Sequence, residues 1–282
     1  MPEFPPPPPA ANDPPPLVRY EDVPTARTVN APTEWFDDDA AAHRRPSKLR
    51  AFLELLALGG VALALPYLFV FFMLAVGSAS DLNFTGDERW LNVIVTNLMG
   101  LLLVIASLVM VRLNSQPLAA IGWTARDLVV NILIGLATLV FVFSMIAGLS
   151  LVLTLLDPTV LTEGTPAQKA IQETFPREMF RWIVPITLWI GIWEETVFRG
   201  FVITRLEAIV RWKWLSVLLG GVIFALGHGY QGPLAMVIIF ALGLLLGAVF
   251  VWRRSLVPCI VVHMLFDFIM FFLLGVTSPD WT

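Results

Sequence analysis

Seven long apolar runs constrain this chain more than any other feature of its sequence. Most of them reach the roughly 20 residues that an α-helix needs to cross a bilayer. They cover residues 51–76, 90–111, 128–156, 182–200, 214–228, 233–252 and 256–276. With 57% hydrophobic and 14% charged residues, the composition excludes a soluble globular domain. We therefore predict an all-α, polytopic membrane bundle of about seven transmembrane helices.

The segment before the first run has a different composition. Residues 5–9 and 14–16 are all proline, and the apolar residues that follow are few. Such a segment buries too little apolar area to fold. We therefore predict a disordered, Pro-rich tail at residues 1–47 and a transmembrane domain at residues 48–282.

Basic residues near the ends of the runs predict the orientation of the chain. Cytoplasmic ends of membrane helices carry an excess of Lys and Arg. With a cytoplasmic N-terminus, seven crossings place twelve basic residues on the inner side: Arg44, Arg45, Lys48, Arg50, Arg112, Arg126, Arg199, Arg205, Arg211, Lys213, Arg253 and Arg254. The outer side then carries four: Arg89, Lys169, Arg177 and Arg181. This predicts a cytoplasmic tail and, at residues 205–213, a short amphipathic helix lying at the inner interface.

Glu194, Glu195 and Arg199 lie within the fourth apolar run. A charge at the centre of a membrane helix costs on the order of 2.5 to 3.5 kcal/mol, so such residues face the protein interior and pair with one another. Glu195 and Arg199 are four residues apart and share a helix face, which predicts an ion pair. Glu194 points about 100° away and is free to meet groups from other helices. The alternative is that both glutamates only cap and pair near a helix end.

Two of the three histidines lie in or at the ends of apolar runs. His228 ends the fifth run, and His263 lies in the seventh, four residues before Asp267. Buried ionisable groups on separate helices need partners and can satisfy one another, so we expect these three residues to converge with Glu194. A rise of about 1.5 Å per residue places Glu194, His263 and Asp267 in the inner half of the bilayer. It places His228 nearer the outer side, unless its helix starts later or dips into the membrane.

Three strings in the chain resemble the three motifs of the CPBP intramembrane proteases: Glu194-Glu195-x-x-x-Arg199, Phe224-x-x-x-His228 and His263-x-x-x-Asp267. This family includes the type II CAAX prenyl endopeptidases and the Abi proteins linked to bacteriocin self-immunity. The resemblance covers residues 182–276, the motif-bearing core, and implies an intramembrane endopeptidase.

The resemblance also implies a role for each matched residue. Glu194 and His228 would activate a water for attack on a peptide carbonyl. His263 and Asp267 would hold the oxyanion, where hydrogen-bond donors matter most. Glu195 and Arg199 would be the supporting pair.

One position departs from the family pattern. Prenyl-protease members commonly carry asparagine where this chain has Asp267, and an ionised aspartate would repel an oxyanion. Asp267 is therefore protonated, accepts a hydrogen bond that orients His263, or ligates a metal. A zinc ion held by Glu194, His228, His263 and Asp267 is the alternative to a metal-free reaction. We expect the metal-free reaction and no cofactor; the zinc signature His-Glu-x-x-His does not occur in the sequence.

These inferences predict an endopeptidase that hydrolyses a peptide bond of a membrane-associated substrate, in the plasma membrane of a prokaryote. A prenylated substrate is implied by distant relatives only. Two other classes are open: a proton-coupled transporter that uses the buried acids as a relay, and a non-catalytic immunity or scaffold protein. A net charge of −4 without a basic patch argues against a nucleic-acid partner. Cys259, the single cysteine, is expected to pack as a small hydrophobic residue.

Overall fold

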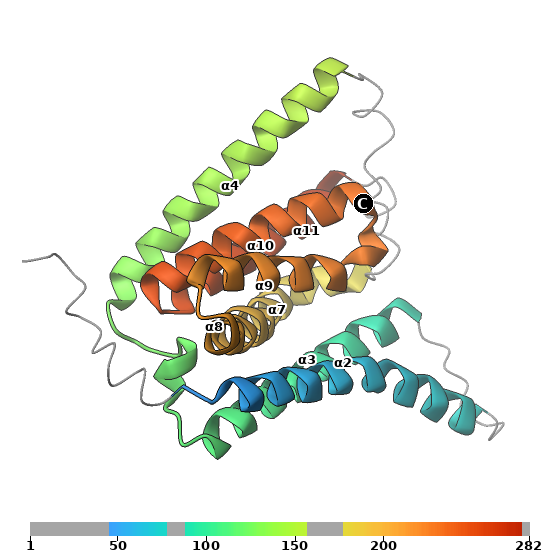
Figure 1. Cartoon of the computed structure of the whole chain (residues 1–282). Helices are drawn as coiled ribbons and strands as arrows, with labels where there is room; N and C mark the ends of the chain where they lie inside the picture. The colour runs from blue at the N-terminus through green and yellow to red at the C-terminus, as the bar shows by residue number, and fades with distance from the viewer. Residues whose placement is uncertain (1–44, 78–87, 157–176, 278–282) are drawn as a thin grey trace, which may run out of the picture. The chain divides into compact units, whose positions relative to one another are not determined.

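Apolar helices make up most of the chain that the structure, a computed structural model, describes: residues 45–77, 88–156 and 177–277 (Figure 1). The helices are α2 Lys48–Gly77, α3 Glu88–Leu113, α4 Leu128–Leu156, α7 Ile183–Glu194, η4 Glu195–Ile203, α8 Thr204–Val210, α9 Lys213–Gly227, α10 Pro233–Arg253 and α11 Val257–Thr277. Short 3₁₀ turns are η2 Leu118–Ile121, η3 Arg177–Trp182 and η5 Gly229–Gln231. No strand occurs in these ranges, so the predicted all-α class is confirmed. The predicted tail lies almost wholly outside the described residues and stays a prediction.

The described helices expose many large apolar side chains and bury several charged ones. Four of them are long and apolar enough to cross a membrane, and the apolar helices α9 and α11 are shorter in the part searched. Leu63 and Tyr67 are 70% and 77% exposed, whereas Glu195 and Arg199 are buried. This arrangement is the reverse of that in a soluble domain and suits contact with lipid. The chain is an integral membrane protein.

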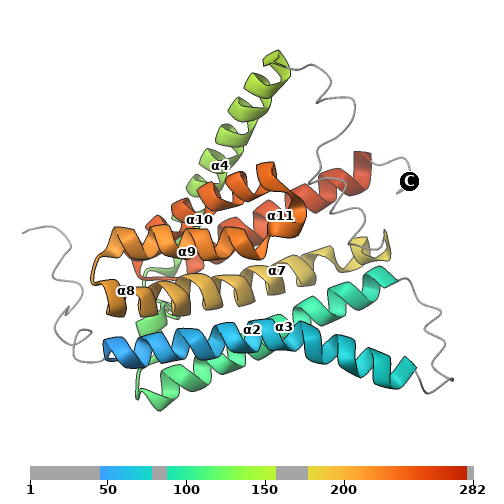
Figure 2. The ribbon, with the colours of Figure 1, turned by 45° about the vertical axis from the view of Figure 1, so that its right-hand side comes forward.

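The central helix of the bundle is α7 with its continuation. It contacts α3 on one side and α11 on the other, and Figure 2 shows α7 and α8 between the α2–α3 pair and helices α9 to α11. Two hydrophobic clusters lie along it, one shared with α2 and α3 and the other with α4, α10 and α11. The segment η4 contributes to both, through Val202 and Ile203 respectively. Its residues are therefore enclosed by protein.

The central helix does not end at Gly200 as predicted. α7 passes without a break into the π-helix η4 and then into α8, which ends at Val210. Arg205 and Glu207, which the sequence placed on a solvated face, are only 1% and 4% exposed. The interfacial amphipathic helix predicted at residues 205–213 is therefore wrong, because these charges have partners inside the protein. Burial of Arg199 and Arg205 also removes both from the inner-side count of basic residues, and ten remain against four.

Candidate active site

Glu195 is fully buried at the first residue of the π-helix. Its Oε1 accepts hydrogen bonds from Arg199 Nη1 at 2.9 Å and from His263 Nδ1 at 2.6 Å. The predicted ion pair between Glu195 and Arg199 is confirmed. The link to His263, 68 positions further along the chain, was not predicted. Glu195 thus ties the central helix to α11.

A glycine allows this link by letting two helices approach closely. A Cβ on Gly191 would lie 3.2 Å from the backbone nitrogen of Met264 and 3.4 Å from the carbonyl oxygen of Ile260. Small residues let membrane helices bring their backbones together. One turn further along, the side chain of Glu195 reaches His263 on α11.

Gly191→Val should therefore push α7 away from α11. The extra methyl groups have no space, and overpacking of this kind costs about 1–3 kcal/mol. Unfolding in detergent and SDS mixtures measures this loss, and the ¹⁵N signal of His263 reports whether its bond to Glu195 survives. Gly59→Val is the matched control, because nothing lies within 4 Å of that position. Equal losses for both variants would show that helix propensity, and not the α7–α11 contact, is responsible.

Glu194 faces two imidazole rings from different helices. Its Oε2 lies 3.9 Å from Nε2 of His228 and 3.6 Å from Nε2 of His263. Within the described residues, this buried oxygen has no hydrogen-bond partner. Both separations exceed a direct hydrogen bond, and three polar atoms around one point are what a bridging water needs. The structure thus brings Glu194, His228 and His263 together, as predicted from the sequence.

The orientation of each imidazole is set by the nitrogen on its other side. His228 Nδ1 lies 2.9 Å from the carbonyl oxygen of Phe224, and His263 Nδ1 lies 2.6 Å from Glu195. Both partners are acceptors, so each Nδ1 carries a proton. In a neutral ring, Nε2 then presents its lone pair toward Glu194. At Nε2, a neutral ring therefore accepts a hydrogen bond and a protonated ring donates one.

Among the contacts that the structure describes, Asp267 contacts the site only through His263. Its Oδ2 lies 3.5 Å from His263 Nε2, the nitrogen that also faces Glu194. The side chain is 20% exposed, more than those of Glu194 and His263. Asp267 therefore lies at the edge of the group.

Phe224 is a residue whose position the sequence did not reveal. Its ring lies under the guanidinium of Arg199, with 4.1 Å from Cζ to the ring centroid, and 4.7 Å from the ring of His228. It also meets His263 edge-on at 6.3 Å. An aromatic residue in an apolar helix usually signals core packing, so only its i, i+4 spacing to His228 was informative.

The depth of His228 is explained by the length of the central helix. The sequence placed His228 too far outward because it ended that helix at Gly200. The helix instead continues 16 residues beyond Glu194, to Val210, and α9 returns so that His228 lies 15 residues beyond Lys213. Two adjoining helical stretches of similar length bring both residues to about one level.

A zinc ion held by Glu194, His228, His263 and Asp267 is the alternative to a metal-free reaction at this site. In the described part of the chain, no group of three His, Cys, Asp or Glu side chains is placed to hold one metal ion. The metal-free reaction and the zinc set considered from the sequence both stay predictions. We derive no step through a metal.

Comparison with known proteins agrees with the motifs. Residues 176–269, about a third of the chain, match the model of a family described as type II CAAX prenyl endopeptidase Rce1-like. No curated protein and no solved structure matches the chain. The matched range contains all six predicted site residues, and the predicted family resemblance is confirmed. It supports a CAAX-type membrane protease in general terms.

Proposed function

We propose that this protein is an intramembrane endopeptidase that hydrolyses a peptide bond of a membrane-associated substrate by a metal-free mechanism. One observation carries the proposal: Oε2 of Glu194 is buried without a hydrogen-bond partner among the described residues, yet within 3.9 Å of two imidazole nitrogens. A carboxylate and the lone pair of His228 directed at one point suit a water that is to be deprotonated. The family match supports peptide hydrolysis as the reaction.

In the proposed reaction, Glu194 is the general base. A water between Glu194 and His228 gives its proton to Glu194 Oε2, while His228 Nε2 accepts the second hydrogen bond and holds the water in line. The water oxygen forms a bond to the peptide carbonyl carbon, and the carbonyl oxygen becomes an oxyanion. Glu194 then returns the proton to the leaving nitrogen as the C–N bond breaks.

His263 stabilises the oxyanion in this scheme. In its protonated form, Nδ1–H stays on Glu195 and Nε2–H is available to a second acceptor. In the free protein the nearest carboxylate oxygen to Nε2 is Oδ2 of Asp267, at 3.5 Å. In the proposed intermediate the acceptor is the oxyanion, where one donor is worth about 10²–10³ in kcat. Of the three roles open to Asp267, we propose that it accepts from His263 and orients it.

The test is cleavage by the purified protein in liposomes. Membrane-anchored peptides, including C-terminally prenylated ones because the matched family is described as prenyl endopeptidase, are incubated in water enriched in oxygen-18. Hydrolysis places one oxygen-18 in each new carboxyl terminus, which mass spectrometry detects. Retained cleavage by both Glu194→Ala and His228→Ala would eliminate this water-activating pair. Proton uptake without any cleavage would instead indicate the transporter alternative.

Chelation tests the metal-free mechanism. We expect EDTA or 1,10-phenanthroline to leave the cleavage rate unchanged, because in the proposed reaction Glu194 and His228 alone activate the water. Elemental analysis of the same sample gives its metal content. Loss of activity that only zinc restores would refute this prediction and favour the zinc-dependent protease.

We further propose that the N-terminus is cytoplasmic, in the plasma membrane of a prokaryote. Arg50 donates to the last carbonyl of α3, at Leu113. Arg205 and Glu207 of α8 pair with Glu54 near the start of α2 and with Arg254 after α10, so these helix ends lie on one side. Cysteines placed at Lys213 and Arg181, both exposed, should react with a membrane-impermeant maleimide from opposite sides. The native Cys259 is buried and should stay silent. Labelling of both cysteines from the same side of the membrane would contradict the proposed topology.

A further inference from the structure

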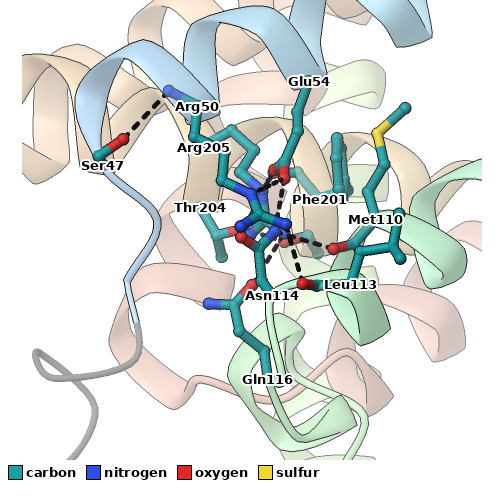
Figure 3. Close-up of polar contacts among 11 residues, drawn as sticks. Ser47, Arg50, Glu54, Met110, Leu113, Asn114, Gln116, Phe201, Thr204 and Arg205 are labelled. Atoms are coloured by element: carbon teal, nitrogen blue, oxygen red, sulfur yellow. Dashed lines mark hydrogen bonds and ion pairs between the residues drawn. The ribbon is translucent and has the colours of Figure 1, made fainter.

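A largely buried polar cluster of Arg50, Glu54, Asn114, Gln116 and Arg205 joins α2 to α8 (Figure 3). Oε2 of Glu54 accepts from Arg205 Nε at 2.7 Å, and Oε1 accepts from Arg50 and Asn114. Arg205 also donates to Gln116 at 2.9 Å. Glu54 and Arg205 are 8% and 1% exposed. This cluster binds the first membrane helix and the end of α3 to the helix that follows η4.

A second ion pair holds α8 from another direction. Arg254, which follows α10, donates to both carboxylate oxygens of Glu207 at 2.8 and 2.9 Å. Arg205 and Glu207 are two residues apart, so they leave the helix in nearly opposite directions. α8 is thus fixed between α2 and the end of α10, and its rotation about its own axis is set.

The rotation of α8 matters because a π-helix separates it from the site. π-Helical hydrogen bonds join residues i and i+5, so a π turn holds more residues than an α turn, and such segments are rare and often functional. Relaxation of η4, Glu195–Ile203, to α geometry would rotate α8 relative to Glu194. The bond between Glu195 and His263 fixes one end of η4. The ion pairs of Arg205 and Glu207 fix the other end.

We propose that Glu54 and Arg205 are positioning residues, which keep η4 in its π form and so hold Glu194 and Glu195 against the two histidines. Packing alone would stabilise α8 as well, because hydrophobic replacements of buried ion pairs are often neutral. Four directed hydrogen bonds converge on Glu54 and Arg205, counting the one between them. Directed bonds fix the rotation of α8 more strictly than apolar packing does. Glu54 lies outside the range that matches the protease family, so this would extend the functional unit to α2. The inference rests on the proposed function.

The experiment combines kinetics with a readout that needs no activity. We expect Arg205→Met to lower kcat about tenfold to hundredfold through misplacement of Glu194, with KM little changed. Arg205→Lys should restore part of the rate, and Glu54→Gln should add little loss to Arg205→Met. Arg253→Met is the matched control: this arginine pairs with Asp127 and Asn131, away from α8, and kcat should stay unchanged.

The chain has only three histidines, so ¹⁵N-histidine spectra of the folded protein resolve each ring. Arg205→Met should shift the His263 signals, and Arg253→Met should not. If Arg205→Met does not fold, Arg205→Lys and Glu54→Asp must show the same shift at smaller amplitude. Unchanged His263 signals in the Arg205 variants, or equal loss of kcat in Arg253→Met, would overturn the inference. A wild-type protein that cleaves no peptide would refute the proposed function, while the His263 signals would still test the positioning role of Glu54 and Arg205.

Discussion

Glu194→Gln is expected to lower kcat for peptide cleavage by about 10²–10⁴-fold, the range that general-base catalysis contributes. The amide fills the volume of the carboxylate but cannot take a proton from the water. KM should change little, because in the proposed reaction Glu194 acts in the transition state and not in substrate binding. Cleavage in oxygen-18 water, followed by mass spectrometry, measures the rate directly.

The structure makes Glu194→Gln a well-controlled change. The side-chain oxygen that it alters has no hydrogen-bond partner among the described residues, so little stability should be lost. Asp127→Asn removes a carboxylate that is 49% exposed and pairs with Arg253, and it should leave the rate unchanged. A Glu194→Gln variant that folds and retains more than about a tenth of the wild-type kcat would be inconsistent with a general base.

The positions of helices could be predicted from the sequence where the local composition alone shows that a segment lies in lipid. The apolar run predicted at residues 128–156 coincides with α4, Leu128–Leu156, because a continuous apolar run in lipid must form a helix to satisfy its own backbone. The fourth helix was predicted ten residues too short. Its charges at Arg205 and Glu207 signal a helix end only when they have no partners, and their partners, Glu54 and Arg254, are remote in the sequence.

The candidate site shows the same division between local and remote contacts. The pair of Glu195 and Arg199 follows from four-residue spacing, and the structure contains it. The convergence of Glu194 with His228 and His263 was predicted because isolated buried charges are costly. The bond from His263 to Glu195 could not be predicted in this way. It depends on how closely α7 and α11 approach at Gly191, a property of packing that helix spacing does not contain.

Arg199→Met is expected to cause the largest loss of stability among these changes, about 3–5 kcal/mol, the cost of breaking a buried ion pair by removing one partner. Glu195 then keeps only the hydrogen bond from His263. Glu195 is 0% exposed, so no water can replace the guanidinium. The contact between Arg199 and the face of Phe224 is lost as well. Titration of the protein in mixed micelles with SDS gives the free energy of unfolding.

Two further variants separate the charge from the packing. Glu195→Gln combined with Arg199→Met removes both charges, and it should recover much of the loss, because the uncompensated carboxylate is the main cost. Arg253→Met breaks a partly exposed pair, whose acceptor Asp127 is 49% exposed, and should cost about 1 kcal/mol or less. If the double variant were no more stable than Arg199→Met, lost packing against Phe224, rather than the isolated charge of Glu195, would be the source of the destabilisation.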